Sequence, residues 1–129
     1  MPRQFEFADS EISRIHRTAQ GCSIAFSAAL ISERQASETQ RSYSNGLRLV
    51  LSPCPPTLSD ESQAFGLLVG GMLRMGQQQL RTLAVPSDYQ AEALSLHLQF
   101  ANGLELQFIG NRLRCDASEQ AQQMEVLAC

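Results

Sequence analysis

Between residues 93 and 115 the turns and the apolar residues independently predict the same strand register. Apolar side chains alternate with polar ones on both sides of the tripeptide Ala101-Asn102-Gly103. The alternating positions are Leu94, Leu96, Leu98 and Phe100 before the tripeptide, and Leu104, Leu106 and Phe108 after it. Alternation with a period of two is typical of a strand that buries one face. The segment therefore predicts a hairpin with one continuous apolar face.

The length of this loop decides which residues face each other. A three-residue loop with Gly103 in the left-handed region places Phe100 opposite Leu104. A two-residue Asn-Gly turn would instead pair Phe100 with Glu105, and it would divide the apolar residues between both faces. The three-residue loop is therefore the prediction.

A second turn is predicted at Gly110-Asn111, whose composition suits a two-residue hairpin loop. That turn would set Phe108 opposite Leu113 and Leu106 opposite Cys115. The whole segment then becomes a three-stranded β-meander over residues 93–115 that shares one apolar face.

Strand signals recur along the rest of the chain, at residues 5–7, 22–30, 47–51, 65–75 and 80–85. They predict an all-β or β-dominated α+β protein, folded as a single domain over residues 1–129. The expected architecture is a small, partly closed antiparallel barrel or roll of about seven to nine strands.

For two further segments the sequence allows two alternative structures, and for a third it predicts a helix. Ile12 to Thr18 reads as a strand or as a helical turn capped by Ser10, and Ser32 to Ser42 as a mobile loop or a hairpin extension. After Cys115, Asp116 and Glu119 resemble a capping box, and apolar residues follow at helical spacing. We therefore expect a short C-terminal helix that covers one end of the barrel.

Residues 43–51 repeat the pattern of residues 100–108: aromatic, small, Asn, Gly, Leu, charged, Leu, any residue, apolar. A duplicated hairpin is one explanation. The other is that three-residue hairpin loops require the same turn chemistry wherever they occur.

Charge and composition exclude several functions. The chain has a net charge of −3 and its ten basic residues are all arginine. Without lysine there is no P-loop lysine and no Schiff base, and the negative charge disfavours nucleic acid as a partner. The sequence also lacks the apolar core of a signal peptide and any run long enough to cross a membrane. We expect a cytoplasmic protein that binds no membrane.

The cysteines and histidines show no metal-binding pattern. Cys22, Cys54, Cys115 and Cys129 form no CxxC pair, and the two histidines, His16 and His97, are isolated. Cys22 and Cys115 fall at inward-facing strand positions, where a thiol behaves as a small apolar group. No metal and no cofactor are expected.

The polar face of the predicted meander offers one candidate ligand site. The predicted register puts His97 beside Gln107 and Gln107 beside Arg114. These side chains could bind a small anion, with Arg114 as the charged anchor and His97 as a titratable donor. The alternative is an ordinary solvated sheet face with cross-strand polar pairs.

The segment from Phe65 to Met75 predicts self-association. It carries apolar residues at both alternating sets of positions, so one set would face solvent unless another surface covered it. We therefore expect a homodimer with Leu68, Met72 and Met75 at the contact.

No catalytic motif supports an enzyme. The chain has neither a GxSxG elbow nor a GxGxxG loop, and its carboxylates are scattered. We expect a non-catalytic binding or interaction module whose partner is a protein or a small ligand. The alternative is a small enzyme or anion-binding protein that uses His97, Gln107 and Arg114.

Overall fold

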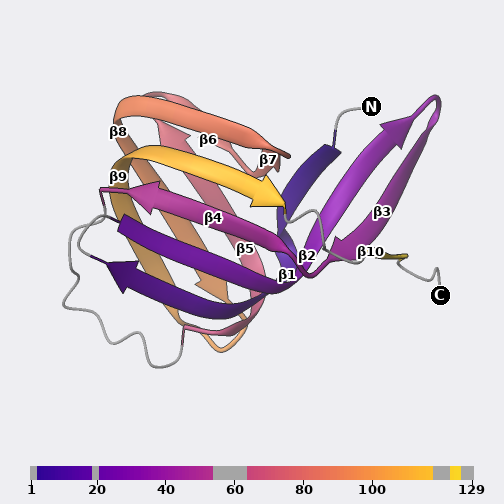
Figure 1. Ribbon diagram of the computed structural model, residues 1–129, viewed down its shortest axis with the longest axis horizontal. Helices are drawn as coiled ribbons and strands as arrows, with labels where there is room; N and C mark the ends of the chain where they lie inside the picture. Colours follow the sequence, from indigo (N-terminus) through magenta and orange to yellow (C-terminus); the bar gives the residue numbers. More distant parts are fainter. Residues whose placement is uncertain (1–2, 19–20, 54–63, 118–122, 126–129) are drawn as a thin grey trace.

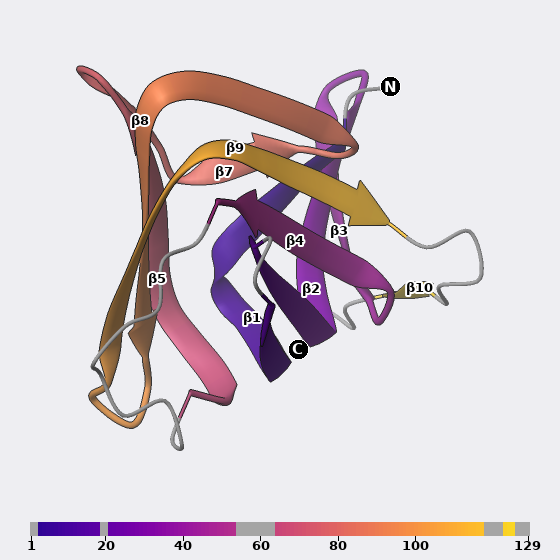
Figure 2. The ribbon, with the colours of Figure 1, turned by 60° about the vertical axis from the view of Figure 1, so that its left-hand side comes forward.

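Six strands form a closed antiparallel barrel in the computed structural model, which describes residues 3–18, 21–53, 64–117 and 123–125 (Figures 1 and 2). Around the barrel these strands are β2 (Gly21–Gln35), β4 (Leu47–Ser52), β9 (Glu105–Ala117), β8 (Ser87–Phe100), β5 (Gly66–Met75) and β1 (Arg3–Thr18). The ring closes because β1 also pairs with β2. The prediction of an all-β barrel is confirmed, and the barrel is closed rather than partly open.

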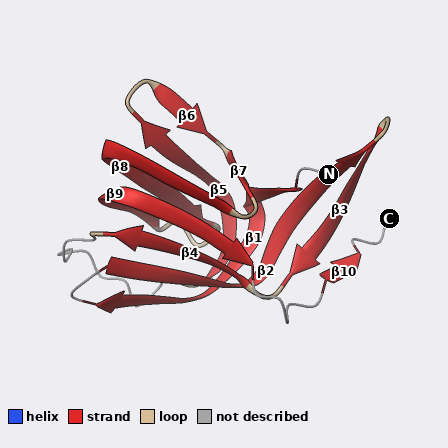
Figure 3. Cartoon of the chain, turned by 45° about the horizontal axis from the view of Figure 1, so that its top comes forward, coloured by secondary structure: helices blue, strands red, loops and turns tan. Residues whose placement is uncertain are grey.

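Four further strands extend the sheet beyond the barrel: β3 (Glu38–Ser44), β6 (Gln78–Leu80), β7 (Thr82–Ala84) and β10 (Gln123–Glu125). The ends of β2 and β3 form a hairpin that projects away from the barrel (Figure 3). The hairpin alternative for residues 32–42 is therefore correct. The described residues contain ten strands in one connected sheet, against about seven to nine expected from the recurrence of strand signals.

The barrel interior is filled by apolar side chains from all six strands. One fully buried example from each strand, in chain order, is Ile12, Ile24, Leu49, Leu68, Leu96 and Leu113. Strand alternation puts the intervening polar residues on the outer surface. Any functional group of the barrel wall must therefore act from the outside.

A bulge in β1 lets that strand belong to both the barrel and the projecting sheet. Glu6 pairs with Leu30 but Glu11 pairs with Ala28, so the segment between them has no regular partner. Ser10 is fully buried there; its Oγ donates to the Glu6 carbonyl (2.6 Å) and accepts from the Leu30 N–H (2.8 Å). The helical-turn alternative for this region is wrong, because Ser10 satisfies the backbone of a bulge rather than capping a helix.

Replacing Ser10 by alanine is expected to lower the free energy of unfolding by about 1–3 kcal/mol, because it removes the hydrogen bonds to the buried Leu30 N–H and the part-buried Glu6 carbonyl. Urea unfolding measures the change. Ser13→Ala is the matched control: Ser13 is exposed and makes one bond to the Ala25 carbonyl, so a loss below about 0.5 kcal/mol is expected. Equal losses in the two variants would contradict the role given to Ser10.

The first predicted hairpin is confirmed residue by residue. Leu96 pairs with Phe108, and Leu98 pairs with Leu106. The loop closes through the Phe100 N–H, which donates to the Leu104 carbonyl at 2.8 Å, and Gly103 has a φ of 94°. Only glycine adopts that backbone conformation without strain, so the three-residue loop follows directly from the sequence.

The second predicted turn is wrong, because β9 runs unbroken through Gly110 and Asn111. A side chain at Gly110 would lie 2.7 Å from the Pro53 carbonyl oxygen, so the glycine serves close packing rather than a turn. Beyond it, Cys115 pairs with Leu49 on one side and Ser87 on the other. Residues 93–115 thus supply parts of two long strands and not a three-stranded meander.

The similarity between residues 43–51 and 100–108 reflects no shared structure. Asn45 and Gly46 connect β3 to β4, and both strands pair with β2 in one continuous register, Ala29 with Ser44 and Ala25 with Arg48. Asn45 and Gly46 therefore form a kink between two strands that follow one another along β2 in the same direction. The hairpin assumed by both explanations does not form there.

The predicted C-terminal helix is not supported by the described residues. Asp116 and Ala117 end β9, and Gln123–Glu125 form β10, which pairs with Ser42–Ser44 of β3. Strand formation here satisfies the outer edge of β3, which would otherwise present unpaired N–H and carbonyl groups. The remaining positions of the predicted helix, 118–122 and 126–129, lie outside the described residues.

Candidate interaction surface

Three large apolar side chains are exposed at alternate positions around the start of β5. Phe65, Leu67 and Val69, which we call the apolar row, are 55%, 45% and 58% exposed. Leu67 pairs with Glu11 of β1 and its carbonyl accepts from the Ala101 N–H, so the backbone beneath the row is held on both sides. The row is therefore a fixed feature of the barrel wall.

A bulge explains why these residues face outward. The pairing of β5 with β8 shifts between Leu68 and Gly70, so Val69 is the extra residue. Alternation reverses there: Phe65, Leu67 and Val69 point out, whereas the later odd-numbered Leu73 is buried. The sequence carries one signal for this bulge, the glycine pair that follows Val69.

The bulge changes which of the residues predicted at the dimer contact can reach the surface. Leu68 is fully buried inside the barrel, so it cannot touch another subunit. Met75 lies on the inward side, half-buried and packed against the core. Met72 points outward opposite His97 and is half-buried. The residues that sequence reasoning missed are those of the apolar row, which it placed on one face together with Leu73 and Met75.

The other end of β5 borders a hollow of about 680 Å³, which we call the β8 hollow. It lies where the pairing of β5 with β8 ends, at Met75 and Leu94, beside the irregular pairing of β8 with β9 between Gln90 and Leu94. Its lining consists of Arg74, Met75, Gly76, Ala91, Glu92, Ala93, Leu94, Ser95 and Ile109. Ile109 is 56% exposed, and the Arg74 guanidinium has no ion-pair partner among the described residues.

Asn111 helps to hold the bulge that opens this hollow. With its amide nitrogen and oxygen oriented to suit their neighbours, the side chain donates to the Glu92 carbonyl at 3.2 Å. One residue of β9 thereby spans the irregular part of β8. The glycine and asparagine that resembled a turn in the sequence therefore help to shape the neighbouring strand.

His97 and Gln107 are cross-strand neighbours on the outer face, as predicted. The Gln107 amide donates to the Ser95 hydroxyl at 3.1 Å, and His97 has no hydrogen-bond or ion-pair partner within the described part of the chain. A histidine acting in acid–base catalysis requires a group within reach that orients it. The surroundings of His97 are those of a polar sheet face.

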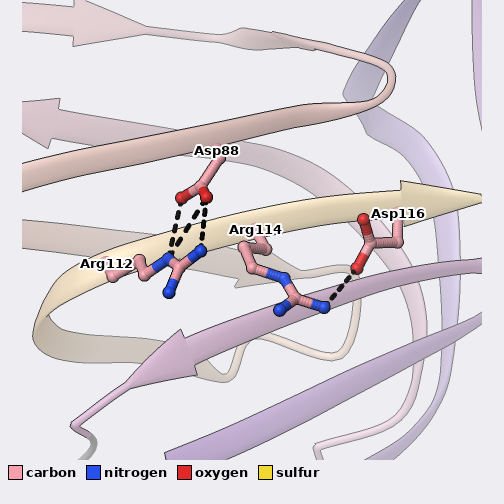
Figure 4. Close-up of polar contacts among 4 residues, drawn as sticks. All are labelled: Asp88, Arg112, Arg114 and Asp116. Atoms are coloured by element: carbon pink, nitrogen blue, oxygen red, sulfur yellow. Dashed lines mark hydrogen bonds and ion pairs between the residues drawn. The ribbon is translucent and has the colours of Figure 1, made fainter.

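Arg114 does not join His97 and Gln107. It lies opposite Val50 and Asp88, because β9 continues where the second turn was expected. Its guanidinium donates to Asp116 at 3.1 Å (Figure 4). The predicted anion site around these three residues is therefore not assembled.

Next to Arg114, the guanidinium of Arg112 donates to both oxygens of Asp88, at 2.6 Å and 3.0 Å (Figure 4). This pairing holds the pKa of the Asp88 carboxyl below its ordinary value and raises that of Arg112. The two ion pairs flank shallow hollows of about 390 and 370 Å³. Asp88 and Asp116 already form ion pairs with Arg112 and Arg114, so the charges of these four exposed residues balance one another.

Metal ligands and thiols are the remaining candidates for chemistry among the described residues. They contain no group of three or more His, Cys, Asp or Glu side chains placed to hold a metal ion. Cys22 and Cys115 are buried, as predicted from their inward positions, and they form no disulfide with each other. Burial, together with the nearby Asp116 carboxylate, raises the pKa of Cys115 to about 12. Its thiol is neutral at physiological pH and is not a nucleophile.

The fold and surface define a closed six-stranded antiparallel barrel with a projecting hairpin and an apolar outer row. None of its described segments is a helix long and apolar enough to span a membrane. No family model, curated protein or solved structure matches the chain.

Proposed function

We propose that this protein is a non-catalytic interaction module that acts as a homodimer, with the apolar row at the contact. The observation that carries the proposal is the exposure of Phe65, Leu67 and Val69, each about half accessible, the first directly before β5 and the other two on it. Single exposed apolar residues are ordinary, but a contiguous set on a rigid element marks an interaction surface.

The polar groups support binding over catalysis. His97 lacks an orienting partner among the described residues, Arg114 is engaged by Asp116, and the Cys115 thiol is buried. Catalysis needs at least two positioned groups of matched protonation in a site that restricts water. An interaction module needs only a complementary apolar surface with a polar rim.

The oligomeric state in solution tests the proposal. Analytical ultracentrifugation at micromolar concentration is expected to give the mass of two chains. Val69→Glu should weaken the dimer at least a hundredfold, because it puts a carboxylate into an apolar contact twice in each dimer. Val69 is 58% exposed, so the variant should keep the thermal stability of the free subunit.

Thr39→Glu is the matched control, because it adds the same charge to an exposed site on the projecting hairpin. It should leave the dimer intact. A monomeric wild-type chain, or a Val69→Glu variant that dimerises as tightly as wild type, would refute the proposal.

A further inference from the structure

We infer that two copies dock reciprocally, with the apolar row of each subunit seated in the β8 hollow of the other across a two-fold axis at the middle of β5. The inference rests on the proposed function and adds the geometry of the contact. It commits the β8 hollow to one occupant, a second copy of this chain.

The row and the hollow lie at opposite ends of one strand, and the hollow reaches the outer surface through Arg74 and Ile109, whereas Met75 and Leu94 in its lining face the core. Leu67 and Val69 point outward near the start of β5, and Arg74 and Ile109, which wall the hollow, are also exposed outward. From Leu67 to Arg74 the strand covers roughly 20 Å. A two-fold axis between them exchanges the two ends, so each row meets a hollow and the assembly closes at two subunits.

The surface between the two features is low enough for close approach. Gly70 has no side chain, and the space that a β-carbon would fill is taken by the Gln99 amide oxygen, 2.9 Å from that position. The Gln99 amide donates to the Glu105 carboxylate at 3.1 Å. Only the half-buried Met72 projects near the middle of the strand. Met72 of each subunit would then lie close to the axis.

Charges at the two ends are complementary. Glu11 pairs with Leu67 and is exposed beside the apolar row, with one carboxylate oxygen engaged by Ser27 at 2.8 Å. Arg74, on the wall of the hollow, has no ion-pair partner among the described residues. Glu92 also lines the hollow, but it forms no ion pair with Arg74. Reciprocal docking brings Glu11 toward Arg74 of the partner subunit, twice in each dimer.

Filling the hollow tests this geometry without touching the row. Ala93 lines the hollow and is exposed, so Ala93→Trp should occupy the space and weaken the dimer at least tenfold. Ala84→Trp adds the same side chain to an exposed position on β7, away from both features, and should have no effect. An unchanged dimer in Ala93→Trp would show that the rows pack against each other instead, which overturns the reciprocal arrangement.

Charge reversal tests the reciprocal geometry independently. Glu11→Arg and Arg74→Glu should each weaken the dimer several-fold, because each places like charges together at both contacts. The double variant should restore the affinity to within about threefold of wild type. If Val69→Glu dissociates the dimer but the double variant rescues nothing, the proposed function stands and the reciprocal geometry is wrong. If the wild-type chain is monomeric, both fail.

Discussion

Replacing Phe7 by alanine is expected to lower the free energy of unfolding by about 3–5 kcal/mol, the loss typical of a fully buried aromatic ring. Phe7 is 1% exposed. Its ring packs edge-to-face against Phe5, with centroids 4.9 Å apart, and Phe5 packs in the same way against Phe26 at 5.0 Å. Removing Phe7 therefore forfeits apolar burial and one end of an aromatic cluster.

The same ring explains Gly71 on the neighbouring strand β5, which pairs with β1. A β-carbon at Gly71 would lie 2.7 Å from both the Cβ and the Cγ of Phe7. Gly71→Ala alone should cost about 1–3 kcal/mol, because neither atom belongs to the flexible end of a side chain. In the double variant the contacts with Cγ and the rest of the ring are gone, and only the contact with the Cβ of residue 7 remains.

We therefore expect Phe7→Ala and Gly71→Ala together to cost at least about 1 kcal/mol less than the sum of the two single losses. Urea unfolding of the four proteins measures this coupling. Additive losses would mean that the two residues do not compete for the same space, contrary to the described packing.

Local sequence rules predicted the parts of the fold that depend on neighbours in the chain. The loop at Gly103 and the register of the strands around it follow from turn chemistry and alternation alone. Asn45 and Gly46 show the limit of the same rules, because identical turn chemistry there produces a kink. The difference lies in β2, which pairs with residues on both sides of the kink and keeps them in line. That partner is distant in sequence, so no local pattern reveals it.

Bulges account for most of the errors at the candidate surface. An extra residue at Val69 reverses the alternation of β5, which moved Leu68 from the predicted contact into the core. The pair formed by His97 and Gln107 was predictable because one short loop sets it. Arg114 was misplaced because its neighbours depend on whether the chain turns at Gly110. The chain does not turn there, because Gly110 is needed instead for close packing against the Pro53 carbonyl.

The second large effect concerns alkaline pH. Burial first, and the Asp116 carboxylate second, raise the pKa of Cys115 from its ordinary value of 9.0 to about 12 in the folded protein. Between these values the unfolded chain loses the thiol proton and the folded chain keeps it. Stability from this group is therefore complete below pH 9 and declines as pH rises toward 12, by about 1.4 kcal/mol for each pH unit.

The total loss is on the order of 4 kcal/mol across that range, which is a large share of the stability of a small domain. The chain has no lysine and only two tyrosines, so the other groups that titrate in this range are mainly those tyrosines and the three remaining cysteines. Urea unfolding under reducing conditions, from pH 8 to pH 11, should show a falling free energy in the wild-type protein. Cys115→Ala and Cys115→Val should each flatten that fall.

The two cysteine variants will differ from each other at neutral pH, because one leaves a small cavity and the other adds bulk. The slope with pH is independent of that offset, so it isolates the thiol. Ser10→Ala serves as the control, since it lowers stability while leaving Cys115 in place, and it should keep the wild-type slope. An alkaline slope that persists unchanged in both cysteine variants would show that another group ionises on unfolding, and that Cys115 does not set the upper pH limit of the fold.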